Sequence, residues 1–400
     1  MRAGDEASSL APTAASLPPL AVYVHVPWCV RKCPYCDFNS HPLGAARPPE
    51  RRFLAALQAD LEGEAALAAG RPVGSVYLGG GTPSLLSPEA VAEILAAVAR
   101  GLALAPGAEV TLEANPGTVD AGRLRELRGA GVNRLSIGVQ SLDDRLLARI
   151  GRIHGARDAR EAVAAARAAG LESLNLDLMY GLPGQTVAQA VRDVEEALAL
   201  APDHLSHYQF TVEPGTAFHR RPPRLPGEVA VARMEDACRE RIAAAGLGRY
   251  EVSAFARPGR RCAHNLNYWS FGDYLGLGPG AHGKLTHAEP WRVVRRAKPA
   301  YPATYLAAAE EGDLQAEVRE LGPGDLGVEF MLNALRLTDG VPAALFTARA
   351  GLPPEAIASP RAKAIARGLL AGDPDRLVAT PLGFRFLDDL VALFALPDPE

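Results

Sequence analysis

Short apolar runs alternate with helix-like segments through the first half of the chain, and this alternation limits the folds open to it. The runs are rich in β-branched residues, whereas the apolar residues between them recur at helical spacing. Strands that alternate with helices predict βαβ units and a parallel sheet. The expected strands cover 21–27, 75–80, 109–115, 134–140, 173–180 and 204–211, and the expected helices cover 50–69, 88–101, 119–130, 155–169 and 185–200.

Six such units are too few for an eight-stranded barrel, so we predict a partial (β/α)6 barrel of the TIM type. An ordinary doubly wound sheet is the alternative, and periodicity alone does not separate the two. Glu113, Gln140 and Asp177 lie at or near the ends of three successive strands. Because barrels of this type carry their chemistry at the carboxyl ends of the strands, these side chains are expected to converge on one ligand.

The remaining sequence predicts four regions. Residues 1–19 are expected to be a disordered lead-in, 20–250 the barrel core, 251–320 a less regular linking region, and 321–400 a smaller, mainly α-helical domain. A Pro- and Arg-rich stretch at 219–228 leads into an expected helix at 229–245. In the last region, helical patterns at 326–337 and 361–371 and an apparent hairpin at 377–387 predict a winged-helix-like shape.

Winged-helix shapes often bind DNA, but the charge argues against a nucleic-acid partner. Residues 321–400 hold seven Lys and Arg against ten Asp and Glu, and the whole chain has a net charge of −4. A DNA-binding domain needs a basic face. No stretch approaches the roughly 20 apolar residues of a membrane span, and the first residues do not fit a secretory signal. The expected location is therefore the cytoplasm, without a membrane anchor.

Three of the five cysteines form a cluster directly after the first expected strand. Their spacing is Cys29-x-x-x-Cys33-x-x-Cys36. Clustered cysteines in a reducing compartment indicate metal binding or catalysis before disulfides. Three thiolates can hold three irons of a 4Fe–4S cluster and leave the fourth iron open to a small molecule. One alternative is a closed zinc site that recruits His25 or His41 as its fourth ligand. The other alternative is that the three cysteines are free thiols that bind no metal.

The motif CxxxCxxC, with Tyr35 before its last cysteine, resembles that of radical S-adenosylmethionine (SAM) proteins. The resemblance implies that SAM chelates the open iron and that the reduced cluster cleaves it to a 5′-deoxyadenosyl radical. A glycine-rich turn, 79–82, follows the second strand. Glycine permits close approach of the backbone to a ligand, but a simple tight turn would show the same sequence. The resemblance assigns SAM contacts to Tyr23, Tyr35, Gly80, Gly81, Thr82, Glu113 (at the ribose hydroxyls), Gln140, Arg152 and Asp177.

A longer series of motifs narrows the resemblance. The stretches HVPWCVRKCPYCDFNSH, YLGGGTPSLL, LEANPG, SIGVQS, DLMYGLPGQT, HNLNYW and GLGPGAHG, spread over about residues 20–395, are similar to the oxygen-independent coproporphyrinogen III oxidase family. The oxidases carry a further cysteine two residues after the third ligand, where this chain has Phe38, and a longer N-terminal segment. Both departures, together with HNLNYW, favour the heme chaperone branch of that family.

The resemblance to this branch implies a protein that binds heme, a 4Fe–4S cluster and SAM and hands heme to an acceptor protein that the sequence does not identify. It is then a carrier of heme and not an enzyme. The alternative is oxidative decarboxylation of coproporphyrinogen III by SAM-derived radical chemistry. A weaker third reading is a radical SAM enzyme that acts on an unrelated substrate.

His264, the first residue of HNLNYW, is the candidate heme ligand. A histidine Nε2 is an ordinary axial ligand of heme iron, and Tyr268 and Trp269 would flank a porphyrin. A hydrogen-bonded core histidine is the plain alternative, and Cys262 is a second candidate ligand. No C-x-x-C-H motif indicates covalent heme attachment.

Residues 278–283 satisfy the pattern G-x-G-x-x-G but lack the setting of a dinucleotide site. That setting requires a strand before the glycines and a helix after them. Here a proline lies inside the motif and KLTHAEPW follows it. We therefore expect a loop near the SAM or heme pocket, with His282 as a minor candidate ligand.

Overall fold

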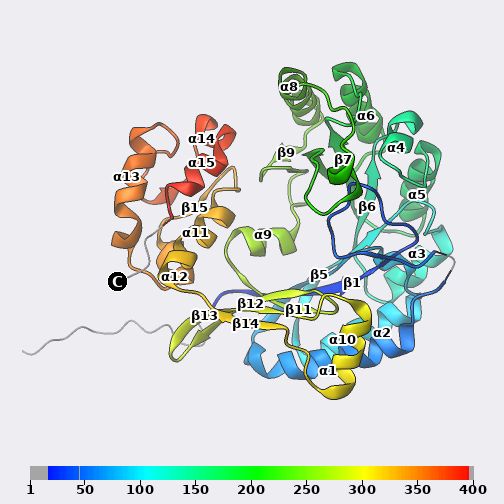
Figure 1. The fold of residues 1–400 in the computed structure, drawn as a ribbon, viewed down its shortest axis with the longest axis horizontal. Coiled ribbons are helices and arrows are strands. Elements are labelled where there is room, and N and C mark those ends of the chain that lie inside the picture. Colours follow the sequence, from blue (N-terminus) through cyan, green and yellow to red (C-terminus); the bar gives the residue numbers. More distant parts are fainter. Residues whose placement is uncertain (1–16, 45, 396–400) are drawn as a thin grey trace, which may run out of the picture.

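A single twelve-stranded sheet forms the centre of the protein (Figure 1). The computed structural model describes residues 17–44 and 46–395. The lead-in expected over 1–19 therefore falls almost entirely outside the described residues. The strand order is β14-β13-β12-β11-β1-β4-β5-β6-β7-β8-β10-β9.

The six expected strands are confirmed, and they are consecutive neighbours that pair in parallel. This is the arrangement of a partial (β/α)6 barrel. The strands are β1 (Leu20–Val26), β4 (Pro72–Gly80), β5 (Ala103–Ala114), β6 (Arg134–Gln140), β7 (Ser173–Tyr180) and β8 (His204–Gln209).

The expected helices are also present, and they cover the outer face of the parallel strands (Figure 1). Ser87 caps one of them by accepting from the backbone N–H of Ala90, as a Ser-Pro start predicts. None of the helices built from the described ranges has both the length and the apolar composition needed to cross a bilayer. The helices are α1 (Glu50–Ala65), η2 (Ala66–Ala68), η3 (Pro83–Leu85), α2 (Pro88–Gly101), α3 (Ala121–Gly129), α4 (Asp144–Arg149), α5 (Ala156–Ala168), α6 (Val187–Ala199), α7 (Ala217–Arg220) and α8 (Glu228–Ala244).

The two faces of each barrel strand differ in chemistry. In β1, Val22, Val24 and Val26 are fully buried in the core between the sheet and the helices. Alternate residues of a strand point to opposite faces, so Tyr23 and His25 lie on the enclosed side. This inner face is polar and aromatic along the whole barrel, which places hydrogen-bonding groups where a ligand can enter.

Residues 251–320, expected to be less regular, instead extend the sheet at both ends. The expectation was wrong because Gly272, Gly276 and Gly278 interrupt the apolar pattern around β11 and make this strand resemble a loop. β11 pairs in parallel with β1, while β12, β13 and β14 continue antiparallel, and β10 pairs antiparallel with β8 and β9. The elements are β9 (Gly248–Arg249), β10 (Ala254–Ala256), α9 (Ala263–Trp269), β11 (Asp273–Leu277), β12 (His282–Ala288), β13 (Trp291–Ala297), α10 (Pro302–Glu311) and β14 (Glu317–Glu320).

The C-terminal region is mainly helical, as expected, and its apolar residues form a second core together with residues of β10 and β13. The hairpin predicted at 377–387 is wrong, because this segment forms the short helices α14 and α15. Thr380 accepts from the backbone N–H of Gly383, and Pro381 occupies the first turn, so the Thr-Pro pair starts a helix where a wing was expected. The elements are α11 (Pro323–Ala334), β15 (Val341–Pro342), α12 (Ala344–Ala350), η4 (Pro354–Ile357), α13 (Ala358–Ala366), β16 (Arg376–Leu377), α14 (Pro381–Arg385) and α15 (Leu387–Ala392).

Candidate functional site

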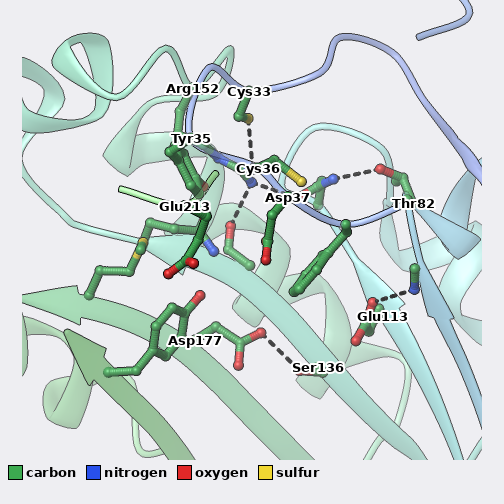
Figure 2. Close-up of a pocket in the computed structure, with 18 of the residues that line it drawn as sticks. Cys33, Tyr35, Cys36, Asp37, Thr82, Glu113, Ser136, Arg152, Asp177 and Glu213 are labelled. Atoms are coloured by element: carbon green, nitrogen blue, oxygen red, sulfur yellow. Dashed lines mark hydrogen bonds between the residues drawn. The ribbon is translucent and has the colours of Figure 1, made fainter. Parts of the chain in front are cut away.

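A cavity of about 360 Å³ opens at the carboxyl ends of the barrel strands (Figure 2). The thiols of Cys33 and Cys36 lie at one end of it, and the carboxylates of Glu113 and Asp177 lie at the other. Of the residues predicted from the sequence, ten line this cavity: Cys33, Tyr35, Cys36, Gly80, Gly81, Thr82, Glu113, Gln140, Arg152 and Asp177.

The cysteines lie on a loop that is fastened at its base. The short strands β2 (Trp28–Cys29) and β3 (His41–Pro42) pair in parallel, so the loop leaves and returns at one place. Cys36 donates its backbone N–H to the carbonyl of Cys33 at 3.1 Å, which turns the chain between these two ligands. Cys29 is buried beside the cavity, in a smaller pocket that Cys33 and Arg152 also line. All three cysteines are free thiols.

Asn39 docks the cysteine loop on the glycine-rich segment that resembled a dinucleotide motif. Its amide nitrogen donates to the carbonyls of Pro279 and Ala300, at 2.9 and 2.8 Å. A Cβ at Gly280 would lie 2.3 Å from that nitrogen, so this contact requires glycine. Strand β12 follows the segment where a dinucleotide site needs a helix, and His282 at its start is exposed.

The glycine-rich turn after β4 packs against the stem of the same loop. Gly80 has φ +112°, and a Cβ there would lie 2.6 Å from Cε1 of His25. The Nε2 of His25 donates to the carbonyl of Asn39 at 2.8 Å, and its Nδ1 accepts from the hydroxyl of Tyr23 at 2.9 Å. Burial lowers the pKa of His25, which agrees with a neutral ring in this chain of hydrogen bonds. Tyr23 therefore supports the cysteine loop through its hydrogen bond to His25 and does not line the cavity itself.

Glu113 ends β5 and is held by two donors. Its Oε1 accepts from the Tyr77 hydroxyl at 2.8 Å, and its Oε2 accepts from the backbone N–H of Gly80 at 3.0 Å. Burial raises its pKa to about 7, and the like charge of Asp177 adds to this effect. Asp177 accepts from Ser136 at 3.0 Å and from Asn175 at 2.8 Å, and burial raises its pKa as well.

Arg152 joins the cysteine loop to the glycine-rich turn. Its Nη1 donates to Sγ of Cys33 at 3.5 Å, and its Nη2 donates to Oδ1 of Asn115 at 2.5 Å. The amide nitrogen of Asn115 donates in turn to the Thr82 hydroxyl at 2.7 Å. This series of hydrogen bonds fixes the positive charge of Arg152 beside the thiol of Cys33 at one end of the cavity (Figure 2).

Gln140 ends β6 at a register shift and has φ +62°. A non-glycine residue with positive φ is uncommon, and such strain concentrates at functional sites. Its Oε1 is buried in the cavity wall without a partner in the structure, as is Nε of Arg152. Two unpartnered polar atoms on one cavity wall are the mark of a site that a polar ligand completes.

The sequence reasoning missed several residues of this cavity. Asn115 follows Glu113 by two positions at the end of the same strand. This position at a strand end could have identified it as a residue of the site. Ser136 lies on the inner face of β6, where its hydroxyl reaches Asp177. Residues contributed by β8 and the chain after it gave no comparable signal; they are Tyr208, Gln209, Thr211 and Glu213.

His264 and Cys262 do not line the cavity. His264 is 3% exposed and lies on α9, and its Nδ1 is 3.1 Å from the Ser75 hydroxyl. Cys262 is buried just before this helix and donates its thiol to Glu109 at 3.3 Å. Burial raises the pKa of Cys262 to about 12, so the thiol stays protonated.

The residues present suit a cubane cluster with SAM. Three free thiols on one loop can bond three different irons, and the cavity beside them offers carboxylates, a guanidinium and backbone groups to a polar ligand. Within the described ranges, no three His, Cys, Asp or Glu side chains are placed to hold one metal ion together. The ligands of a cubane cluster do not converge on one ion, because each thiolate bonds its own iron.

Comparisons with known proteins agree with this site. The model of the Radical SAM superfamily matches residues 23–197, and that of the HemN C-terminal domain matches residues 321–386. Coproporphyrinogen III oxidase (HemN) from Escherichia coli, described as a radical SAM enzyme, has the same fold, with a TM-score of 0.80 at 22% identity over 95% of this chain and 91% of that one.

Two curated relatives are similar over nearly their whole length. The chain is 45% identical over 378 residues to the heme chaperone HemW of Escherichia coli (strain K12), covering 94% of this chain and 98% of that protein. It is 42% identical over 381 residues to the heme chaperone HemW of Haemophilus influenzae, with the same coverage. Membership of the radical SAM superfamily implies a 4Fe–4S cluster and SAM. The chain belongs to the HemW family of radical SAM proteins.

Proposed function

We propose that this protein is a heme chaperone that binds a 4Fe–4S cluster, SAM and heme and passes heme to an acceptor protein. The proposal is supported by the relatives named heme chaperone HemW, which match nearly the full chain. The observation that carries the cofactor part is the single cavity with thiols at one end and paired carboxylates at the other. The acceptor is a protein, and neither nucleic acid nor a membrane anchor enters the proposal.

In this proposal Cys29, Cys33 and Cys36 hold three irons, and SAM occupies the fourth iron and the adjoining cavity. Such a cluster supplies an electron that can cleave a carbon–sulfur bond of SAM. Glu113 accepts hydrogen bonds from the ribose hydroxyls, and the glycine-rich turn lets the backbone reach the methionine part. Arg152 keeps a positive charge beside Cys33, 3.5 Å from its sulfur.

The heme ligand in this proposal is His264. Its Nε2 is buried and has no hydrogen-bond partner in the structure, so the atom that would bond iron is not engaged elsewhere. Burial lowers the pKa of His264 to about 3, so the ring is neutral and able to coordinate. Since the side chain is only 3% exposed, heme iron reaches it when α9 shifts from its place against the barrel. Cys262 is the weaker candidate, because its protonated thiol already donates to Glu109.

Oxidative decarboxylation of coproporphyrinogen III is the alternative function. The solved oxidase shares the fold at 22% identity, which does not extend to its activity. Phe38 stands where the oxidases carry a further cysteine, and its side chain is 61% exposed at the edge of the cavity. The chemistry at this edge of the cavity therefore differs from that of the oxidases, which favours the carrier.

A heme titration under anaerobic conditions tests the proposal. Heme added to the cluster-loaded protein should produce a shifted Soret band that saturates at about one heme per chain. His264→Ala should weaken this binding at least tenfold, whereas His207→Ala, another buried histidine, should leave it unchanged. A Soret band that does not shift contradicts the proposal. A second assay supplies reductant, SAM and coproporphyrinogen III, and decarboxylated product would support the oxidase instead.

A further inference from the structure

The ring of His264 packs against Tyr77, the residue that holds Glu113. Their ring centroids are 5.0 Å apart with an interplanar angle of 28°. The hydroxyl of Tyr77 donates to Glu113 at 2.8 Å. One side chain therefore separates the histidine of HNLNYW from the carboxylate assigned to the SAM ribose.

His264 is itself fixed from two directions. The Ser75 hydroxyl is 3.1 Å from its Nδ1, and Ser75 lies on the inner face of β4, two residues before Tyr77. The carboxylate of Glu109 accepts the backbone N–H groups of Ala263 and His264, at 3.1 and 3.2 Å. These groups are the unpaired donors of the first turn of α9, so a β5 carboxylate anchors the helix against the barrel.

Two aromatic rings pack against Tyr77. Its ring is stacked on Tyr23 at 6.2 Å as well as on His264, and its hydroxyl makes its hydrogen bond to Glu113. Removing the imidazole would leave a void beside the phenol ring, and a ring with space on one side leaves its rotamer more readily. Glu113 would then keep only the backbone N–H of Gly80 as a donor.

We propose that His264 is a positioning residue of the SAM site: through Tyr77 it holds the Glu113 carboxylate in the orientation that receives the ribose hydroxyls. The inference rests on the proposed function, in which Glu113 binds SAM. It gives the HNLNYW helix a second task besides heme binding, because α9 packs against the barrel strands β1 and β4 (Figure 1).

Equilibrium dialysis of SAM against the full-length, cluster-loaded protein tests this role. His264→Ala should bind SAM about tenfold more weakly, the loss expected when one hydrogen bond to a charged group is released. His264→Phe restores a ring against Tyr77 and should bind SAM like the unchanged protein. His207→Ala, which removes a buried histidine that packs on Tyr180 and not on Tyr77, serves as the matched control and should bind SAM like the unchanged protein. Because Tyr77→Phe breaks the same link, the His264→Ala/Tyr77→Phe double variant should be no weaker than either single variant.

Unchanged SAM affinity in His264→Ala overturns the proposal, and so does a His264→Phe variant that binds as weakly as His264→Ala. If His264→Ala fails to retain its cluster, Tyr77→Phe carries the test, since it removes one hydroxyl, and unchanged affinity in that variant overturns the proposal as well. The proposal that His264 is the heme ligand is tested by a separate outcome. His264→Phe has no ligand for iron, so heme binding that persists in this variant rejects the heme ligand without altering the SAM result.

Discussion

The guanidinium of Arg152 donates to the sulfur of Cys33, which ties a cation from the loop between α4 and α5 to the loop that carries the cysteines. The same group also donates to Asn115 and to the carbonyl of Gly138. These contacts place the charge firmly, because a guanidinium with several acceptors cannot turn away from one of them without losing the rest.

This contact predicts a change in the reduction potential of the cluster. Hydrogen bonds to the sulfurs and nearby charge set such potentials, and a cation favours the more negative, reduced state. Arg152→Gln should therefore lower the midpoint potential by about 60 mV, if the bond contributes about 1.4 kcal/mol to a one-electron couple. A redox titration followed by electron paramagnetic resonance measures it. Arg157→Gln, an exposed arginine on α5, is the control, and an unshifted potential in Arg152→Gln contradicts the assignment.

Loss of a cluster ligand should abolish the cluster. Anaerobic reconstitution should give about four irons per chain, and Cys29→Ala, Cys33→Ala or Cys36→Ala should each remove the visible absorption of the cluster. Iron analysis and absorption spectra provide the measurement. Cys238→Ala, on the buried face of α8, should keep the iron. A cubane cluster that survives in any of the three variants would mean that the ligands are misassigned.

The pKa of Glu113 predicts how SAM binding depends on pH. Burial raises it from an ordinary 4.5 to about 7, with Tyr77, Tyr23 and Asp177 as the titratable groups around it. Since the ionised form accepts from hydroxyls, SAM affinity should fall as the pH drops below about 7, by up to about tenfold per unit. Glu113→Gln should bind weakly at every pH, with this dependence removed. Titrations of SAM from pH 6 to pH 8 would show it, and equal slopes in both proteins contradict the role.

The Glu113 carboxyl should also change the free energy of unfolding with pH. A rising pH should lower this free energy, whereas it strengthens SAM binding. The pKa of this carboxyl in the folded chain lies above that in the unfolded chain, so the folded state binds more protons between about 4.5 and 7. Its contribution to the free energy of unfolding therefore decreases as the pH rises through this window. Thermal unfolding of the ligand-free protein should show that Glu113→Gln gains stability relative to the unchanged chain as the pH rises. No relative gain would contradict the raised pKa.

The hydrogen bonds of Asn39 predict that a substitution at Gly280 lowers the free energy of unfolding. Gly280 and Gly259 have nearly equal φ values, +71° and +74°, but only at Gly280 would a Cβ collide with Asn39, while the same atom at Gly259 meets nothing within 4 Å. Gly259→Ala should cost about 1 kcal/mol of backbone strain, and Gly280→Ala about 2 kcal/mol more. Unfolding in denaturant measures both, and equal costs would show that the docking adds nothing.

Much of the barrel was predictable because its signals are local. The strands of the barrel are short apolar runs between clear helices, and Glu113 and Gln140 mark strand ends that a parallel sheet brings to one edge. The cysteine spacing lies within eight residues and needs no tertiary information. The cysteine motif is such a local pattern, and the structure places Cys33 and Cys36 at the cavity and Cys29 in the pocket beside it.

The rest depended on contacts between distant segments. The position of His264 inside the barrel follows from Glu109 and Ser75, which lie more than 150 residues away, and no periodicity encodes that meeting. The contacts of Arg152 with Cys33 and Asn115 likewise join segments that are far apart in the sequence, and only the family resemblance pointed to this residue. The hairpin expected near the C-terminus failed for a local reason, since alternating apolar residues outweighed the Thr380-Pro381 start signal.

The bonds from Asn39 to Pro279 and Ala300 span 240 and 261 residues of sequence. A ribosome adding about 5–20 residues per second takes roughly 13–50 s to make that much chain. The cysteines leave the ribosome early, yet their loop gains its last supports only after residue 300 has emerged and folded beside it. In the proposed function, a chain truncated before residue 279 would therefore present the three cluster cysteines on a loop that lacks both bonds from Asn39.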